Sequence, residues 1–127
     1  MKSYIVYRGA HYTVEWYYDS RGRSVAKEYY QEQTAVQQSK LLALIVRMAD
    51  RGKIFDLTKF NNEGDGIYAF KPRPDRYLCF FFKEKRIIIT NAFTKKVQKI
   101  PAREKERAIG AYNDYKNRVI RGDYYEY

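Results

Sequence analysis

Positively charged side chains gather in the second half of this sequence, beside short runs of apolar and aromatic residues. Residues 71–107 hold twelve lysines and arginines against four acids, a local net charge of +8 in a chain whose total is +10. Such a field attracts polyanions, above all the phosphates of a nucleic acid, or an acidic protein partner. A solvated basic face without a ligand is the alternative interpretation of any charge run.

The sequence offers few residues for disulfide formation or metal binding. The chain has one cysteine, Cys79, and one histidine, His11, so it can form no internal disulfide and offers no cysteine and histidine cluster for a metal. We interpret Cys79 as buried filler and His11 as structural. The apolar run at 4–7 is too short for a signal sequence, and no run approaches the roughly 20 residues of a membrane span. We therefore predict a cytoplasmic protein without cofactor, metal or membrane contact.

The N-terminal half predicts a strand followed by a helical pair. Residues 12–18 are β-branched and aromatic, as in a strand, and residues 3–7 can pair with them as a hairpin. Ser24 and Thr34 are suitable N-caps for two successive helices, and Gly52 is a suitable stop. We expect a helical hairpin, or one kinked helix, between these limits.

The C-terminal half predicts a meander and a last helix. After a connection at 53–66 come three apolar runs, at 67–70, 77–82 and 87–89. Pro101 suits the first turn of the last helix. This order predicts an α+β fold, a small antiparallel sheet (β-α-α-β-β-β-α) packed on a helical hairpin in two layers. We expect one domain, 1–127, in which residues 121–127 form a loose tail.

Three stretches of this second half resemble a known family. They read DGIYAFK at 65–71, RYLCFF at 76–81 and FTKKVQKIP at 93–101, the last followed by Glu104. In this order, after a helical pair, they resemble the RelE/ParE superfamily of bacterial toxins, and within it the HigB-type, phage Gp49-like branch. The resemblance extends from about residue 12 to residue 115 and implies a RelE-like fold.

The resemblance also implies an activity. Proteins of this type are toxins of type II toxin–antitoxin systems that cleave messenger RNA, commonly on the translating ribosome. Metal-free cleavage uses the RNA 2′-hydroxyl as nucleophile, so the protein must hold the phosphate, stabilise its extra charge and assist two proton transfers. The implied partners are mRNA, the ribosome and a cognate antitoxin protein of the helix-turn-helix type.

The cations near the strand ends are the candidates for these roles. The predicted catalytic residues are Arg76, Lys71 and Lys95, and the predicted RNA-binding residues are Arg73, Lys96, Lys99, Tyr68 and Tyr77. Arg76 begins a central strand and is the best candidate for stabilising transition-state charge. Its alternative role is a surface ion pair with Asp75 or Glu84. The two tyrosines could stack on a base or lend a proton, and core packing is their alternative role.

Two positions depart from the family pattern. Ala69 stands where a glutamate is usual, and Lys71 stands where an arginine is usual. Lysine keeps the charge but lacks the two-pronged guanidinium. A second function therefore stays open, namely a non-catalytic RelE/ParE-fold binding protein, either a ParE-like topoisomerase inhibitor or an inactive phage protein that only binds RNA.

Overall fold

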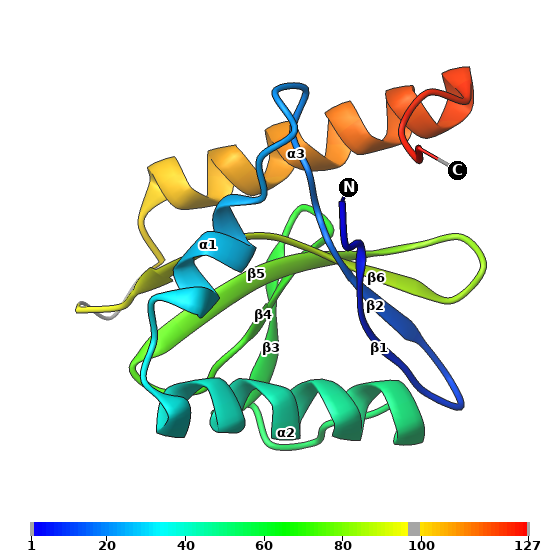
Figure 1. Cartoon of the computed structure of the whole chain (residues 1–127). Helices are drawn as coiled ribbons and strands as arrows, with labels where there is room; N and C mark the ends of the chain where they lie inside the picture. Colours follow the sequence, from blue (N-terminus) through cyan, green and yellow to red (C-terminus); the bar gives the residue numbers. More distant parts are fainter. Residues whose placement is uncertain (1, 97–99, 127) are drawn as a thin grey trace.

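A computed structural model describes residues 2–96 and 100–126, which form one sheet with helices packed around it (Figure 1). The elements in chain order are β1 (Ile5–Arg8), β2 (Thr13–Trp16), α1 (Val25–Gln31), α2 (Ala35–Arg51), β3 (Phe60–Gly64), β4 (Ile67–Phe70), β5 (Asp75–Phe82), β6 (Arg86–Thr94) and α3 (Ala102–Arg121). This order confirms the predicted α+β class, including the N-terminal hairpin and the last helix.

The strands form a mixed sheet in the order β1-β2-β6-β5-β4-β3. β2 and β6 run parallel, from Thr13 opposite Arg86 to Trp16 opposite Ile89, and the other neighbouring pairs are antiparallel. The prediction of a wholly antiparallel sheet is thus wrong, because the N-terminal hairpin adds to the last strand of the meander. The run Ile87–Ile89 is completely buried, the pattern of a strand that is covered on both faces.

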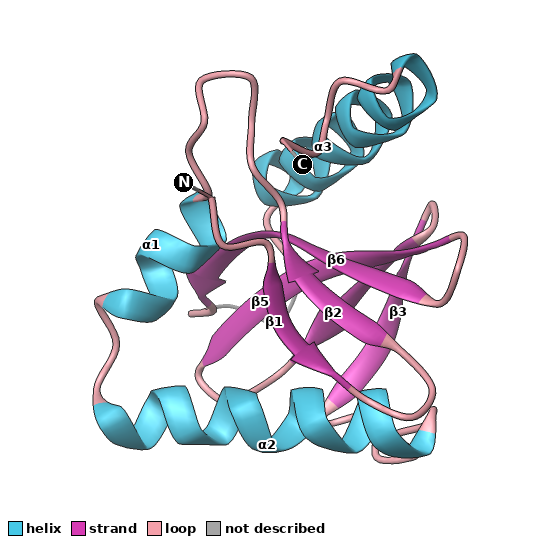
Figure 2. Cartoon of the chain, turned by 45° about the vertical axis from the view of Figure 1, so that its right-hand side comes forward, coloured by secondary structure: helices cyan, strands magenta, loops and turns pink. Residues whose placement is uncertain are grey.

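Helices cover both faces of this sheet, with α2 on one side and α3 on the other (Figures 1 and 2). On the α2 side Leu41 and Ile45 are fully buried. On the α3 side the ring of Phe80 lies 4.8 Å from that of Tyr112 and 5.5 Å from that of Tyr115. The two-layer arrangement predicted from the sequence is therefore incomplete, since α3 forms a third layer.

The helical pair has the predicted ends. The Ser24 side chain accepts a hydrogen bond from the Lys27 amide at 3.3 Å, and Thr34 accepts one from the Gln37 amide at 3.2 Å. Gly52 ends α2 in a left-handed conformation with φ of +77°. The caps separate a short α1, which packs against β6, from α2, which lies along the sheet.

The connection predicted at 53–66 contains an edge strand, β3. Its residues Phe60–Gly64 include the polar sequence Asn-Asn-Glu, which is typical of a turn, yet they pair with β4 from Phe60 opposite Phe70 to Gly64 opposite Ile67. The turn itself is confined to Asp65 and Gly66, with φ of +57° and +81°. Two successive residues with positive φ suit a tight hairpin turn, so the Asp-Gly pair marks the hairpin and the asparagines belong to its strand.

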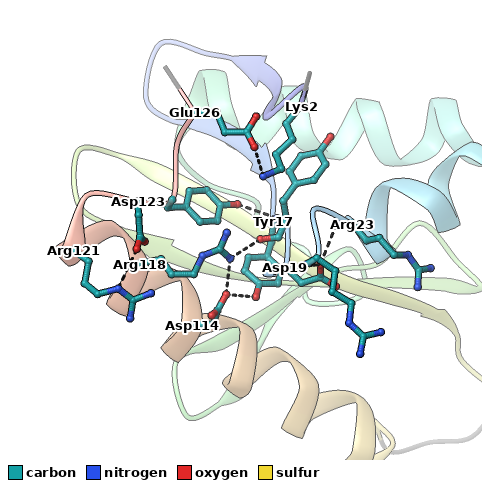
Figure 3. A network of polar contacts seen from close by, with 12 residues as sticks. Lys2, Tyr17, Asp19, Arg23, Asp114, Arg118, Arg121, Asp123 and Glu126 are labelled. Atoms are coloured by element: carbon teal, nitrogen blue, oxygen red, sulfur yellow. Dashed lines mark hydrogen bonds and ion pairs between the residues drawn. The ribbon is translucent and has the colours of Figure 1, made fainter.

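The C-terminal tail, predicted to be loose, is instead docked against the molecule. Tyr124 is only 1% exposed, and its hydroxyl accepts a hydrogen bond from the Tyr18 amide at 2.9 Å. The Arg118 guanidinium lies 4.7 Å from the centre of the Tyr124 ring and donates to the Asp114 carboxylate at 2.7 Å. Figure 3 shows Asp114 between Arg118 and Tyr17, whose hydroxyl also donates a hydrogen bond to it. The tail thereby ties the end of α3 to the segment that follows β2.

The turn between β1 and β2 packs against the last turns of α2 without room for a side chain at Gly9. A Cβ atom there would lie 2.3 Å from the Ala49 carbonyl carbon. We expect Gly9→Ala to lower the free energy of unfolding by about 1–3 kcal/mol, because the hairpin must move away from α2. Urea denaturation would measure this. The matched control is Gly110→Ala in α3, where a Cβ meets nothing within 4 Å, and which should stabilise by about 0.5–1 kcal/mol. Equal effects of both changes would contradict the close packing.

Candidate nucleic-acid interface

The end of β4, the start of β5 and the end of β6 lie side by side and bring four predicted cations together. Phe70 of β4 pairs with Tyr77 of β5, so the next position along places Lys71 opposite Arg76. Arg76 in turn pairs with Phe93 of β6. The Lys95 amide donates to the Pro74 carbonyl at 3.0 Å, which attaches the end of β6 to the β4–β5 connection that carries Arg73.

The charges of this cluster influence one another. Partial burial lowers the pKa of Lys71, and the positive charges of Arg76, Lys95 and Arg73 lower it further, whereas Glu63 acts in the opposite direction. Partial burial and the charge of Arg73 likewise lower the pKa of Arg76. Lys71, Arg73, Arg76 and Lys95, which we call the cation cluster, are therefore close enough to repel one another. A bound anion would relieve this repulsion.

Arg76 has no carboxylate partner within the described part of the chain. Its Nη1 donates to the Asp75 backbone carbonyl at 2.9 Å, and its buried Nε has no hydrogen-bond partner. The two predicted alternative partners are engaged elsewhere, since Asp75 accepts from Tyr29 at 2.7 Å and Glu84 lies 3.7 Å from Arg86. The guanidinium is thus held by the backbone and forms no ion pair in the described residues, and such a group suits the binding of a phosphate.

Asp75 has a structural role beneath this site. It is 2% exposed, and its carboxylate accepts hydrogen bonds from the Tyr29 hydroxyl and from Gln37 Nε2, at 2.7 and 3.0 Å. Burial raises the pKa of Tyr29 to about 12, so the phenol stays protonated and can donate. Gln37 Nε2 also donates to the carbonyls of Pro72 and Arg73. The two helices α1 and α2 therefore fix the β4–β5 connection that carries the cations.

The four remaining predicted residues have different surroundings. Lys96 is exposed directly after Lys95. Lys99 lies outside the described residues. Tyr68 is stacked on Phe60 with ring centres 5.7 Å apart, in the aromatic layer of the sheet. Tyr77 is 1% exposed and packs edge-on against Tyr29, so its ring is part of the core and has no free face for a base.

The structure adds residues that the sequence did not indicate. Tyr29 and Gln37 position the site from the helical pair, and Glu63 is the acid that acts on both Lys71 and Arg76. Asn61 on β3 has a buried side-chain oxygen without a partner in the described part of the chain, opposite Ala69 of β4. The only sequence signal for any of them was helical periodicity or turn propensity, and neither indicates a distant neighbour.

The comparison with known families agrees with this arrangement. The model of the phage-derived Gp49-like protein family (DUF891) matches residues 28–113, which is more than half of the chain. The chain belongs to this family. The Gp49-like match runs from α1 into α3 and includes the whole cation cluster, whereas the β1–β2 hairpin and the docked tail lie outside it.

Membership of the Gp49-like family is consistent with the superfamily of toxin–antitoxin toxins and suggests a module with an antitoxin partner. A comparison with curated proteins found no match. Among the helices of the described residues, none is both long and apolar enough to span a bilayer.

The lowered pKa of Lys71 implies that its charge destabilises the folded protein. The pKa of Lys71 is lower in the folded than in the unfolded protein, so the charged side chain destabilises the fold. This destabilisation is fully present below the folded-state pKa, and it is lost as the pH rises above the unfolded-state pKa. Lys71→Gln should therefore raise the free energy of unfolding at pH 7 by on the order of 0.5 kcal/mol, and its advantage should shrink as the pH rises. Urea denaturation at several pH values would measure this, with Lys83→Gln, in the turn that follows β5, as control. A less stable variant would show that the Lys71 Nζ bond to the Leu57 carbonyl outweighs the repulsion.

Proposed function

We propose that this protein is the toxin of a type II toxin–antitoxin system and cleaves messenger RNA on the translating ribosome. The observation that carries the proposal is the cation cluster, in which Arg76 has no ion pair within the described residues and lies close to Lys71 and Arg73, with Lys95 beside Lys71. The Gp49-like family supports the toxin part of the proposal. A phosphate is the ligand that such a cluster would take, because charge-assisted bonds to its oxygens would satisfy the guanidinium and relieve the repulsion.

The proposed reaction is an internal transfer of the phosphoryl group. The 2′-oxygen forms a bond to phosphorus while the bond from phosphorus to the 5′-oxygen breaks, leaving a 2′,3′-cyclic phosphate and a 5′-hydroxyl. Arg76 would stabilise the extra negative charge on the non-bridging oxygens. The neutral form of Lys71, which its lowered pKa favours, would accept the proton of the 2′-hydroxyl, and protonated Lys95 would give a proton to the departing 5′-oxygen.

The same charge supports an antitoxin partner. A basic surface attracts an acidic segment, which would cover the cation cluster and block the phosphate site. We propose a helix-turn-helix antitoxin with such a segment, encoded beside this protein.

Expression in growing bacteria tests the function. Two reporter messages should be compared, one with and one without a start codon, and their 5′-hydroxyl ends mapped. We expect growth arrest and new ends in the translated message alone. Growth arrest without new ends, accompanied by DNA-damage signalling, would instead indicate a topoisomerase inhibitor. Absence of both effects would reject a toxin.

A further inference from the structure

A second cationic feature lies between the β4–β5 connection and α2. A cavity of about 270 Å³ opens there, lined by five basic side chains and no acidic one. These side chains, which we call the α2 pocket cations, are Lys40, Arg47, Lys59, Lys71 and Arg73. Figure 2 shows α2 running along this side of the sheet.

Helical spacing explains how α2 forms its wall of the cavity. Lys40, Leu44 and Arg47 lie four and three residues apart, so they share one face of the helix. Leu44 is 7% exposed and forms an apolar floor, while the two basic side chains are exposed at the rim. The opposite wall is the β4–β5 connection, which Gln37 holds through its bonds to the Pro72 and Arg73 carbonyls. The cavity is therefore formed by fixed elements.

The charge of the cavity is not balanced by ion pairs within the described residues. The salt bridges of that part of the chain involve other cations, and Lys71 Nζ donates to a backbone carbonyl, that of Leu57, at 3.0 Å. Two nearby acids offset part of the positive charge without forming an ion pair there: Asp56, whose pKa is lowered by the Thr58 hydrogen bonds and also by Lys59 and Arg73, and Glu63, whose charge acts on Lys71. Five cations around one small cavity attract an anion strongly.

Two residues join this cavity to the cation cluster. Lys71 and Arg73 line the cavity and also belong to the group of charges around Arg76. A ligand that uses both places must carry repeated anionic groups along one chain, as a single RNA strand does at every nucleotide. The apolar floor beneath a basic rim suits a ribose or base whose phosphate is held above it.

We propose that the α2 pocket cations bind a phosphate of the same RNA strand, next to the phosphate held at Arg76. Lys40, Arg47 and Lys59 then form a flanking subsite that sets how the strand crosses the β4–β5 connection. This inference rests on the proposed function for the identity of the ligand, RNA, but it does not require that the protein cleaves the RNA.

The test is binding of a short single-stranded RNA whose 2′-hydroxyls are methylated, so that it cannot be cut. We compare the double variant Lys40→Gln/Arg47→Gln with Arg51→Gln/Lys53→Gln, which removes the same charge from the last residue of α2 and from the segment just after it. Fluorescence anisotropy at several salt concentrations measures the Kd. The cavity variant should bind more weakly, and its slope of log Kd against log salt should fall by about 0.7 for each phosphate that it no longer neutralises. The control should keep nearly the wild-type slope.

Three other outcomes would decide between this inference and its alternatives. If both double variants lose the same RNA affinity at unchanged Tm values, the cavity attracts RNA only through its general charge, and the inference is overturned. Normal RNA binding with lost binding of a polyglutamate peptide would assign the cavity to an acidic protein segment and also overturn it. A protein that binds RNA through the cavity but cuts no message would overturn the proposed function and leave this inference standing.

Discussion

Replacing Arg76 by alanine is expected to abolish growth arrest and to lower the rate of RNA cleavage by about two to three orders of magnitude, the usual effect of losing one donor to a developing negative charge. The reason lies in how the side chain is held. Its Nη1 is anchored on the Asp75 carbonyl, its Nε has no partner in the described part of the chain, and no carboxylate there pairs with it. Cleavage of a translated reporter message, followed by the appearance of 5′-hydroxyl ends, measures the effect.

Two further variants make this experiment selective. Arg76→Lys keeps the charge but loses the planar pair of donors, so it should retain only part of the activity. Arg21→Ala, in the exposed loop before α1, removes an arginine of equal charge and should leave cleavage unchanged. Arg76→Ala that cuts at the wild-type rate, at an unchanged Tm, would remove Arg76 from the mechanism and leave the cluster as a binding surface alone.

The local features of this fold could be predicted from sequence because their causes are local. Ser24, Thr34 and Gly52 define the helical pair through caps that act within one turn. The apolar runs of the meander specify the strands, and the basic residues at their ends follow from the strand assignment. The cation cluster was therefore predictable as a group, since strand ends of a meander must meet.

Long-range partners could not be predicted in the same way. No pattern around Tyr29 or Gln37 shows that both side chains hold Asp75 or fix the β4–β5 connection. The Asn-Asn-Glu sequence of β3 has turn propensity, and only pairing with β4 makes it a strand. The α2 pocket cations come from separated segments, so that cavity appears only once α2 lies against the connection.

The two ends of the chain lie outside the Gp49-like match but contact each other in the structure. The matched residues 28–113 carry the cation cluster, while the β1–β2 hairpin and the tail lie outside them. The N-terminal segment and the tail nevertheless pack against each other. Tyr4 of the N-terminal segment packs against Tyr124 with ring centres 5.7 Å apart, and Lys2 pairs with Glu126 at 2.6 Å. We infer that the two ends form a common support that keeps α3 on its face of the sheet.

Tyr124→Ala tests this support, and we expect it to lower the free energy of unfolding by about 3–5 kcal/mol, as for other large buried rings. The Tyr124 ring is 1% exposed and packs edge-on against Tyr115 at 4.6 Å, with the Arg118 guanidinium over it. Its removal leaves a cavity between α3 and the sheet. Urea denaturation followed by circular dichroism measures the loss.

Tyr124→Phe separates packing from hydrogen bonding. It keeps the ring and removes only the hydroxyl that accepts from the Tyr18 amide, so it should cost about 1–3 kcal/mol, the usual effect of leaving a buried donor unsatisfied. If Tyr124→Ala costs less than Tyr124→Phe, or neither changes stability, the tail does not support α3. Because Tyr124 does not belong to the cation cluster, any loss of RNA cleavage in Tyr124→Ala should follow the loss of folded protein and disappear at low temperature, where the variant is folded.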